Sequence, residues 1–230
     1  MIFLAGDTHG SFDLDKVLDF FEIEVLLHEV SKEDYLIILG DVGVCWDGGK
    51  KDEWVLEKLR SLPVTVLWLD GNHENFDLLK EYPVTSWKGG KVHRIAPDII
   101  HLMRGYTYLI DGKVIWVFGG GASVDRMWRR KSISWWKEEM PSQEEYARGL
   151  ESLQKVDFQV DYILTHTAPR SVATQLVDVM LPGEEVLQYY LQQVAENASF
   201  RGWYFGHWHM DRTIDEKYHA LMEEVVRLVE

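Results

Sequence analysis

The sequence predicts an α/β fold, because short apolar runs rich in β-branched and aromatic residues alternate with longer stretches of helical periodicity. With 230 residues, of which 46% are hydrophobic and 27% charged, the chain is long enough to bury a sizeable core. No linker rich in Gly, Ser or Pro, no internal repeat and no low-complexity tract divides it. We therefore expect a single domain over residues 1–230.

Six short runs are the predicted strands of this alternation. They are Ile2–Ala5, Tyr35–Leu39, Val64–Leu69, Val114–Phe118, Tyr162–Thr165 and Trp203–Phe205. In the stretches between them, apolar residues recur at intervals of three and four, which predicts helices. The predicted helices are Leu14–Val30, Asp52–Leu62, Asn75–Glu81, Ser142–Lys155 and Glu184–Asn197.

Between residues 91 and 118 the pattern changes to consecutive β-like segments, which predicts a second, partly antiparallel sheet. The segments are Val92–Ile95, Ile99–Leu102 and Tyr106–Ile110. Asp111 and Gly112 form a hairpin signal before the next predicted strand. Near the end of the chain, Tyr218–Met222 and Val225–Val229 are compatible with two strands or with one helix.

The composition limits the classes of partner. A formal net charge of −14 repels polyanions, so we expect no long nucleic acid as partner, and a phosphate substrate needs local positive charge from metal ions or arginines. Cys45 is the only cysteine, which excludes an intramolecular disulfide and a thiolate zinc site. No apolar run approaches membrane-spanning length, and the first residues lack the regions of a signal peptide. We expect a soluble cytoplasmic protein without a membrane partner.

Five of the predicted strands lead directly into side chains that can bind metals. The donors in these clusters are Asp7, His9, Asp41, Asn72, His166, His207 and His209. In open α/β sheets, groups at the carboxyl ends of parallel strands converge on one crevice. Four imidazoles, two carboxylates and an amide are too many for one ion, whereas two ions that share one carboxylate would use them all. Oxygen and imidazole donors suit Mn²⁺, Fe or Zn²⁺.

These clusters, in this order, resemble the calcineurin-like metallophosphoesterase superfamily, whose pattern is D-x-H, G-D, G-N-H-D/E, a lone His and G-H-x-H. The resemblance spans residues 6 to 209 and implies a four-layer α/β/β/α sandwich with two mixed β-sheets. It implies two divalent metal ions, for which we expect Mn²⁺, with Fe or Zn²⁺ as alternatives. One ion would be held by Asp7, His9, Asp41 and His209, and the other by Asp41, Asn72, His166 and His207.

The resemblance also implies a function, the hydrolysis of a phosphomonoester or phosphodiester by in-line attack of a metal-bound hydroxide, with Asp41 as the bridging carboxylate. In the family, the residue at His73 lies near the leaving-group oxygen, where a positioned acid contributes on the order of 10²–10⁴-fold. The family's protein phosphatases carry an Asp and an Arg where this chain has Val44 and Asp70. That departure argues against a Ser/Thr protein phosphatase and leaves the partner of His73 unidentified.

A run of glycines and arginines follows the predicted strand Val114–Phe118. Three arginines fall within residues 126–130, and a guanidinium can bind phosphate oxygens with two hydrogen bonds. Together with Ser134, Trp135 and Trp136, this stretch resembles a bacterial and phage subgroup of the superfamily. Of these arginines, Arg126 is the preferred phosphate contact, and the expected substrate-binding set is Asn72, His73, Arg126 and Arg129.

Two other functions stay open. A nuclease or nucleotide phosphodiesterase uses the same chemistry, and the negative charge argues against long nucleic acids but not against a nucleotide. A non-catalytic protein-interaction scaffold of the same fold is disfavoured, because every ligand position of the motif is kept. The expected partner is thus a small phosphate ester or a nucleotide, and the sequence does not predict an oligomeric state.

Overall fold

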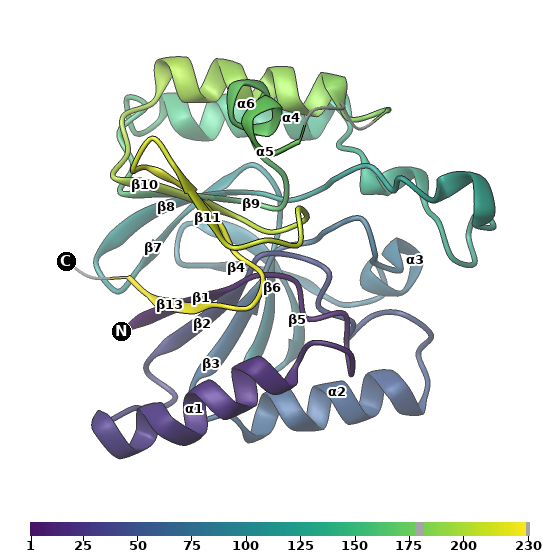
Figure 1. Ribbon diagram of the computed structural model, residues 1–230, viewed down its shortest axis with the longest axis vertical. Helices are drawn as coiled ribbons and strands as arrows, with labels where there is room; N and C mark the ends of the chain where they lie inside the picture. Colours follow the sequence, from purple (N-terminus) through teal and green to yellow (C-terminus); the bar gives the residue numbers. More distant parts are fainter. Residues whose placement is uncertain (178–181, 229–230) are drawn as a thin grey trace.

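The computed structural model describes residues 1–177 and 182–228, which form two stacked β-sheets with helices on both outer faces (Figure 1). The strands of the first sheet are β1 (Ile2–Ala5), β2 (Tyr35–Ile38), β3 (Thr65–Trp68), β4 (Val84–Trp87), β5 (Gly90–Ala96), β6 (Ile99–Leu102) and β13 (Val225–Arg227). Their order is β13-β1-β2-β3-β6-β5-β4. The four central strands β1, β2, β3 and β6 run parallel, and the outer strands pair antiparallel.

The strands of the second sheet are β7 (Tyr106–Ile110), β8 (Lys113–Phe118), β9 (Tyr162–Thr165), β10 (Gly202–Phe205), β11 (Arg212–Ile214) and β12 (Tyr218–Ala220), in the order β11-β12-β10-β9-β8-β7. Strands β8, β9, β10 and β12 are parallel, and β7 and β11 are antiparallel to their neighbours. Asp111 and Gly112 join β7 to β8 with φ angles of 48° and 74°, which confirms the predicted hairpin turn.

The helices cover the two outer faces of the sheet pair (Figure 1). They are α1 (Asp15–Leu27), α2 (Lys50–Ser61), α3 (Phe76–Leu79), α4 (Gln143–Gln154), α5 (Arg170–Leu176) and α6 (Glu185–Asn197), with short 3₁₀ helices at Arg126–Trp128 and Lys137–Glu139. Helices α1 and α2 lie against the first sheet, and α4, α5 and α6 lie against the second. None of the described helices has the length and apolarity needed to cross a lipid bilayer.

Side-chain alternation along the strands produces the layers. On β1, Phe3 and Ala5 pack among the residues of α1 and α2, whereas Ile2 and Leu4 pack into the apolar layer between the two sheets. A third apolar cluster joins the second sheet to α4, α5 and α6. These three apolar layers separate four layers of secondary structure. The predicted α/β/β/α sandwich with two mixed sheets is therefore confirmed.

The prediction for residues 91–118 was wrong about sheet membership. Strands β5 and β6 extend the first sheet, because β6 pairs with β3 through Val66 and Ile99, and only β7 and β8 belong to the second sheet. Strands β4 and β11 and helix α5 were not predicted. At the end of the chain, the two-strand alternative is right and the helix is wrong, with β12 and β13 in different sheets. Val229 lies outside the described residues.

Candidate metal centre

All seven predicted metal ligands follow the carboxyl ends of parallel strands. Asp7 and His9 follow β1, Asp41 follows β2, and Asn72 follows β3, all in the first sheet. The second sheet supplies its imidazoles in the same way, from the segments that follow β9 and β10: His166, His207 and His209. The structure brings the two sets together at one edge of the sandwich, where strand ends converge.

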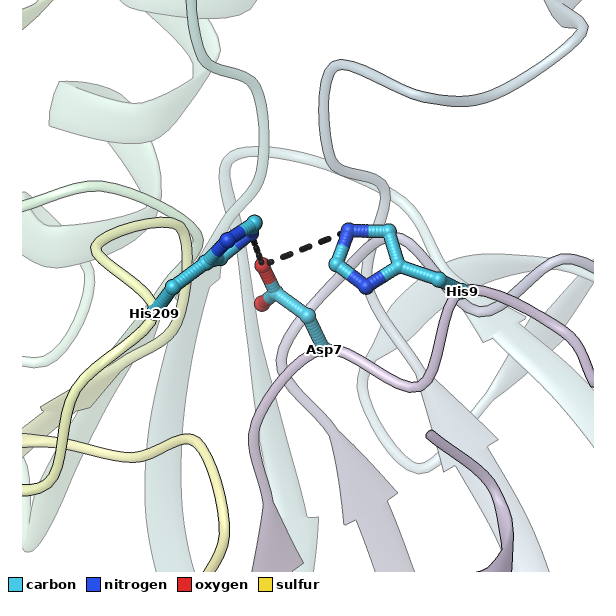
Figure 2. A group of neighbouring side chains, drawn as sticks. All are labelled: Asp7, His9 and His209. Carbon is cyan, nitrogen blue, oxygen red and sulfur yellow. Dashed lines mark ion pairs between the residues drawn. The ribbon is translucent and has the colours of Figure 1, made fainter. Parts of the chain in front are cut away.

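Asp7, His9 and His209 form the first group of donors (Figure 2). Nε2 of His209 lies 3.2 Å from Oδ2 of Asp7, and Nε2 of His9 lies 4.0 Å from the same oxygen. Figure 2 shows the two rings approaching the buried carboxylate from opposite sides. One ligand atom from each residue falls within 4.8 Å of the others, so a single cation could contact all three. His209 is 56% exposed, so this end of the site is open to solvent.

Asp7, Asp41 and His166 form a second group, which lies deeper because all three are buried. Nδ1 of His166 lies 3.8 Å from Oδ1 of Asp7, and its Nε2 lies 3.6 Å from Oδ2 of Asp41. The same Asp41 oxygen is 3.6 Å from Nε2 of His9. Asp7 is shared by both groups, and Asp41 lies between them. The spacing fits two cations that are close neighbours.

The hydrogen bonds around His166 leave three acceptors facing one another. Nδ1 of His166 donates to the carbonyl of Leu39 at 2.7 Å, so Nε2 would carry the lone pair in the neutral ring that metal binding requires. Nε2 lies 3.0 Å from Oδ1 of Asn72, whose amide nitrogen donates to Ser123 at 3.2 Å. With Asp41 beside them, an amide oxygen, an imidazole nitrogen and a carboxylate oxygen converge. A cation resolves this arrangement, and the donor types suit Mn²⁺, Fe or Zn²⁺.

The pKa values of the acidic and imidazole side chains show that Asp7 and Asp41 are ionised in this site. Burial raises the pKa of Asp7 and of Asp41, but the adjacent imidazoles, His166 foremost, outweigh it and lower both values. Burial lowers the pKa of His9, but Asp41 and Asp7 raise it to about 9. The two ionised carboxylates thus favour a proton on His9. A divalent cation would displace that proton and take over its charge.

Four candidate ligands have left-handed backbone conformations. The φ angles are 43° for His9, 52° for Asp41, 67° for His207 and 49° for His209. Non-glycine residues adopt this region at a cost of about 1–2 kcal/mol each, and such residues cluster at functional sites. The turn at His9 is held because its N–H donates to the carbonyl of Asp41 at 2.7 Å. The backbone conformation of these four residues therefore directs the candidate ligands into the site at some cost in stability.

A close approach explains the glycine at position 71. A Cβ atom there would lie 2.0 Å from Oδ1 of Asp41, which accepts a hydrogen bond from the N–H of His73 at 2.7 Å. Any side chain at position 71 would push the Asp41 carboxylate away from its place. The carboxylate of Asp7 is also held by a backbone hydrogen bond, because its Oδ1 accepts from the N–H of His207 at 3.0 Å.

Two carboxylates that the sequence did not predict orient the imidazoles. Oδ2 of Asp13 lies 2.8 Å from Nδ1 of His9, and Oε1 of Glu184 lies 3.1 Å from Nε2 of His207. The contact with Asp13 engages Nδ1 of His9 and leaves Nε2 for a metal, whereas Glu184 is the ion-pair neighbour of His207. Glu184 is buried, and its charge raises the pKa of His207 to about 9 although burial lowers it. Asp13 is four residues after His9, a spacing that carries a weak signal, whereas Glu184 has no motif around it.

Arg129 is the partner of His73 that the sequence left unidentified. Its guanidinium nitrogen NH2 lies 2.8 Å from Nδ1 of His73, and its Nε lies 2.7 Å from Oδ1 of Asp125. Burial and the adjacent guanidinium lower the pKa of His73, although Asp41 opposes them. Arg126 lies elsewhere, with its guanidinium 4.0 Å from the centre of the Trp135 ring. The structure thus brings one of the two predicted arginines to the site.

Asp70 occupies the position where the family's protein phosphatases carry an arginine. It is buried, accepts from Nε of Arg104 at 2.5 Å and lies 3.1 Å from Nε2 of His101. Burial raises the pKa of Asp70, but Arg104 outweighs it and lowers the value. Arg104, from the segment between β6 and β7, therefore supplies positive charge next to Asp70. The contacts with Arg104 and His101 hold Asp70 in place, two residues before Asn72.

A cavity of about 480 Å³ opens beside the first group of donors. His9, Asp41, His73 and His209 form the wall that it shares with the candidate metal centre. The remaining wall is formed by Gly10, Ser11, Phe12, Asp13, Gly43, Trp46, Lys51, Asp52 and Val55. The volume falls in the range of about 300–1,000 Å³ that is usual for small-molecule sites.

Comparison with known proteins gives one family. The model described as calcineurin-like phosphoesterase matches residues 1–211. Among curated proteins, none matches this chain at a significant level. Among solved structures, the crystal structure of phosphopantetheinyl hydrolase from Mycobacterium tuberculosis is similar, with 16% sequence identity and a TM-score of 0.46, over 96% of this chain and 89% of that chain.

Proposed function

This chain belongs to the calcineurin-like phosphoesterase family, and from that premise we propose that it hydrolyses a phosphomonoester or phosphodiester with two divalent metal ions. Family membership makes it a metal-dependent phosphoester hydrolase, and the number of ions, the type of ester and the mechanism are our proposal. The observation that carries the proposal is the convergence of Asp41, Asn72 and His166, where three acceptor atoms meet at distances of 3.0 and 3.6 Å.

We assign the ligands as the motif does. Asp7, His9, Asp41 and His209 would hold one ion, and Asp41, Asn72, His166 and His207 the other. The distance of 3.6 Å from one Asp41 oxygen to both His9 and His166 supports a bridging position. The donor set favours Mn²⁺, with Fe or Zn²⁺ as the alternatives. We further propose that residues 1–230 act as a single cytoplasmic domain.

When bound, the two ions would neutralise charge on the phosphoryl oxygens and lower the pKa of water from about 15.7 towards about 7, which makes hydroxide available at neutral pH. The chain's own residues then direct the displacement. NH2 of Arg129 lies 2.8 Å from Nδ1 and 3.1 Å from Nε2 of His73, so this guanidinium would position the ring. The imidazolium form of His73 would pass a ring proton to the leaving oxygen as the ester P–O bond breaks and would be left as the neutral ring, and Arg129 and Asn72 would hold the phosphoryl group. Arg126 stays a predicted contact without structural support.

Metal analysis combined with turnover tests this proposal. We expect the purified protein to bind Mn²⁺ and to hydrolyse p-nitrophenyl phosphate or its bis ester, and we expect a chelator or Asp41→Asn to abolish turnover. Faster hydrolysis of the bis ester would favour a nucleotide phosphodiesterase or nuclease. Metal binding without turnover of either ester would contradict the proposal and favour a scaffold.

A further inference from the structure

We propose that the cavity beside His73 binds the alcohol part of the substrate, and that this alcohol is aromatic and carries an anionic group. The inference rests on the proposed phosphoester hydrolysis, and it adds the chemical class of the ester. Three features of the cavity wall support the inference. Part of the wall is apolar, its carboxylates already have hydrogen-bond partners, and one of its cationic groups has no ion-pair partner among the described residues.

The cavity continues directly from the candidate metal centre. His9, Asp41 and His209 belong to its wall, and so does His73, the proposed proton donor. A phosphoryl group held at the metal centre would therefore have an ester oxygen facing the cavity. The group beyond that oxygen, which leaves as the alcohol, would occupy the 480 Å³ space.

Flat and apolar side chains form much of the opposite wall. The Trp46 ring lies 6.4 Å from the His73 ring, with an angle of 35° between their planes. Val55 of α2 is buried, whereas Phe12 is 84% exposed, although exposure of a whole phenyl ring is unfavourable. An aromatic ligand in the cavity would remove apolar surface of Trp46 and Phe12, which both line it, from water. These contacts fit an aromatic group better than a sugar or a polyol.

The carboxylates in the wall already have hydrogen-bond partners. Oδ2 of Asp52 accepts from the backbone N–H groups of Trp46, Asp47 and Gly48 at 2.7, 3.0 and 2.9 Å. Asp13 contacts His9 at 2.8 Å. Oδ2 of each carboxylate is thus already engaged by groups of the protein, which lowers its attraction for a cationic group of a ligand. The carboxylates of the wall therefore favour a positively charged alcohol less than their number indicates.

Among the described residues that line the cavity, Lys51 is the one lysine or arginine. It is exposed, and within residues 1–177 and 182–228 no carboxylate lies within ion-pair distance of its ammonium group. Lys51 and Val55 are one helical turn apart on α2, so they contribute to the same wall. An unpaired ammonium beside an apolar wall fits an aromatic ligand with an anionic substituent.

A pair of esters with alcohols of similar acidity isolates the contribution of the aromatic group. We expect kcat/KM for 2-phenylethyl phosphate to exceed that for ethyl phosphate about tenfold or more, as burial of an aromatic ring in a pocket allows. Phe12→Ala and Trp46→Ala should each reduce this ratio to below about threefold. Leu26→Ala, which removes an exposed side chain of α1 outside the cavity, should preserve the ratio.

Lys51 is tested with an ester that carries the anionic group. We expect 2-(4-carboxyphenyl)ethyl phosphate to be preferred over 2-phenylethyl phosphate about fivefold, the size of a charge-assisted contact at a partly exposed site. Lys51→Met should abolish this preference, and the adjacent, non-lining Lys50→Met should keep it. An equal loss for both esters in Lys51→Met would mean that Lys51 binds the phosphate, which would overturn the anionic part of the proposal.

Binding measurements with phosphonates, which are not hydrolysed, test the cavity independently of the proposed hydrolysis. We expect the Mn²⁺-loaded protein to bind 2-phenylethyl phosphonate more tightly than ethyl phosphonate in calorimetric titrations, and we expect Phe12→Ala to remove the difference. If both phosphate esters are hydrolysed with equal kcat/KM, the cavity proposal fails while hydrolysis stands. If neither ester is hydrolysed but the Phe12-dependent difference in binding is seen, the cavity proposal holds and the proposed function fails.

Discussion

Gly71 and Asp41 are in such close contact that the smallest substitution should disrupt the site. A methyl group at position 71 would lie 2.0 Å from an Asp41 oxygen, so the carboxylate must move by more than an ångström. We expect Gly71→Ala to lower kcat/KM on the order of 10²-fold, because misplacement of a catalytic group by about 1 Å has that effect. Gly49→Ala is the control, since its nearest neighbour is the flexible Asp47 side chain at 3.0 Å. Equal activity of the two variants would contradict the role given to Gly71.

Glu184 and His207 should make the stability of the metal-free protein depend on pH. The pKa of Glu184 is lowered from 4.5 to about 2, because His207 outweighs the effect of burial, so its contribution is present above pH 4.5 and is lost towards pH 2. The pKa of His207 is raised from 6.5 to about 9, so the contribution of the same pair is complete below pH 6.5 and is lost as the pH rises through 9. We expect Glu184→Gln to lower the free energy of unfolding by about 2–3 kcal/mol between these limits.

Urea unfolding with a chelator present, from pH 3 to pH 9.5, measures this difference. The loss should be largest between pH 4.5 and 6.5 and should shrink on both sides. Glu185→Gln, one residue further along and exposed, should have little effect at any pH. A loss in Glu184→Gln that does not vary with pH would show that the residue acts through packing and not through its charge.

Single residues in motifs were the most predictable part of the site. The motif from Asp7 to His209 named the side chains that the structure brings together, because each follows a strand end whose direction the fold determines. Glu184 and the contact between Arg129 and His73 could not be predicted. Each of these two contacts joins residues that are far apart in the sequence. The sequence around Glu184 and around Arg129 has no motif that predicts where these residues lie in the folded protein.

At the scale of elements, two of the three arginines in the segment between β8 and α4 have different surroundings. Arg129 contacts His73 at 2.8 Å, whereas Arg126 lies against Trp135. We expect Arg129→Ala to lower kcat on the order of 10²-fold, because His73 loses its positioning contact, and we expect Arg126→Ala to change kcat by less than threefold. Steady-state kinetics with one ester measure both. A larger loss in Arg126→Ala would restore Arg126 as the principal phosphate contact.

The elements themselves were predictable where periodicity is local. The helix over residues 142–155 is one example, since Ser142 and Glu145 form the capping box that begins α4. The membership of β5 and β6 was not predictable, because the pairing of Val66 with Ile99 depends on the packing of the whole sheet. An apolar run of four residues has the same pattern whichever sheet it joins.

At the scale of the whole molecule, bound metal should stabilise the fold. The site combines ionised Asp7 and Asp41 in a buried location, and ions that bind only the folded chain raise its stability by about 2.7 kcal/mol at 100 times Kd. We expect Mn²⁺ to raise Tm by roughly 5–10 °C relative to the chelated protein. Calorimetry with and without a chelator measures the shift. Asp41→Asn should show a much smaller rise, and an equal rise in that variant would contradict the assigned site.

The arrangement of ligands over two sheets has a mechanical consequence. Asp7, Asp41 and Asn72 follow strands of the first sheet, and three imidazoles follow strands of the second, so the ions would cross-link the two sheets at one edge. Sliding of one sheet over the other by even an ångström would change the distance between the cations. Amide hydrogen exchange should therefore slow in β1 and β10 together when metal is added, although those strands are not neighbours in either sheet.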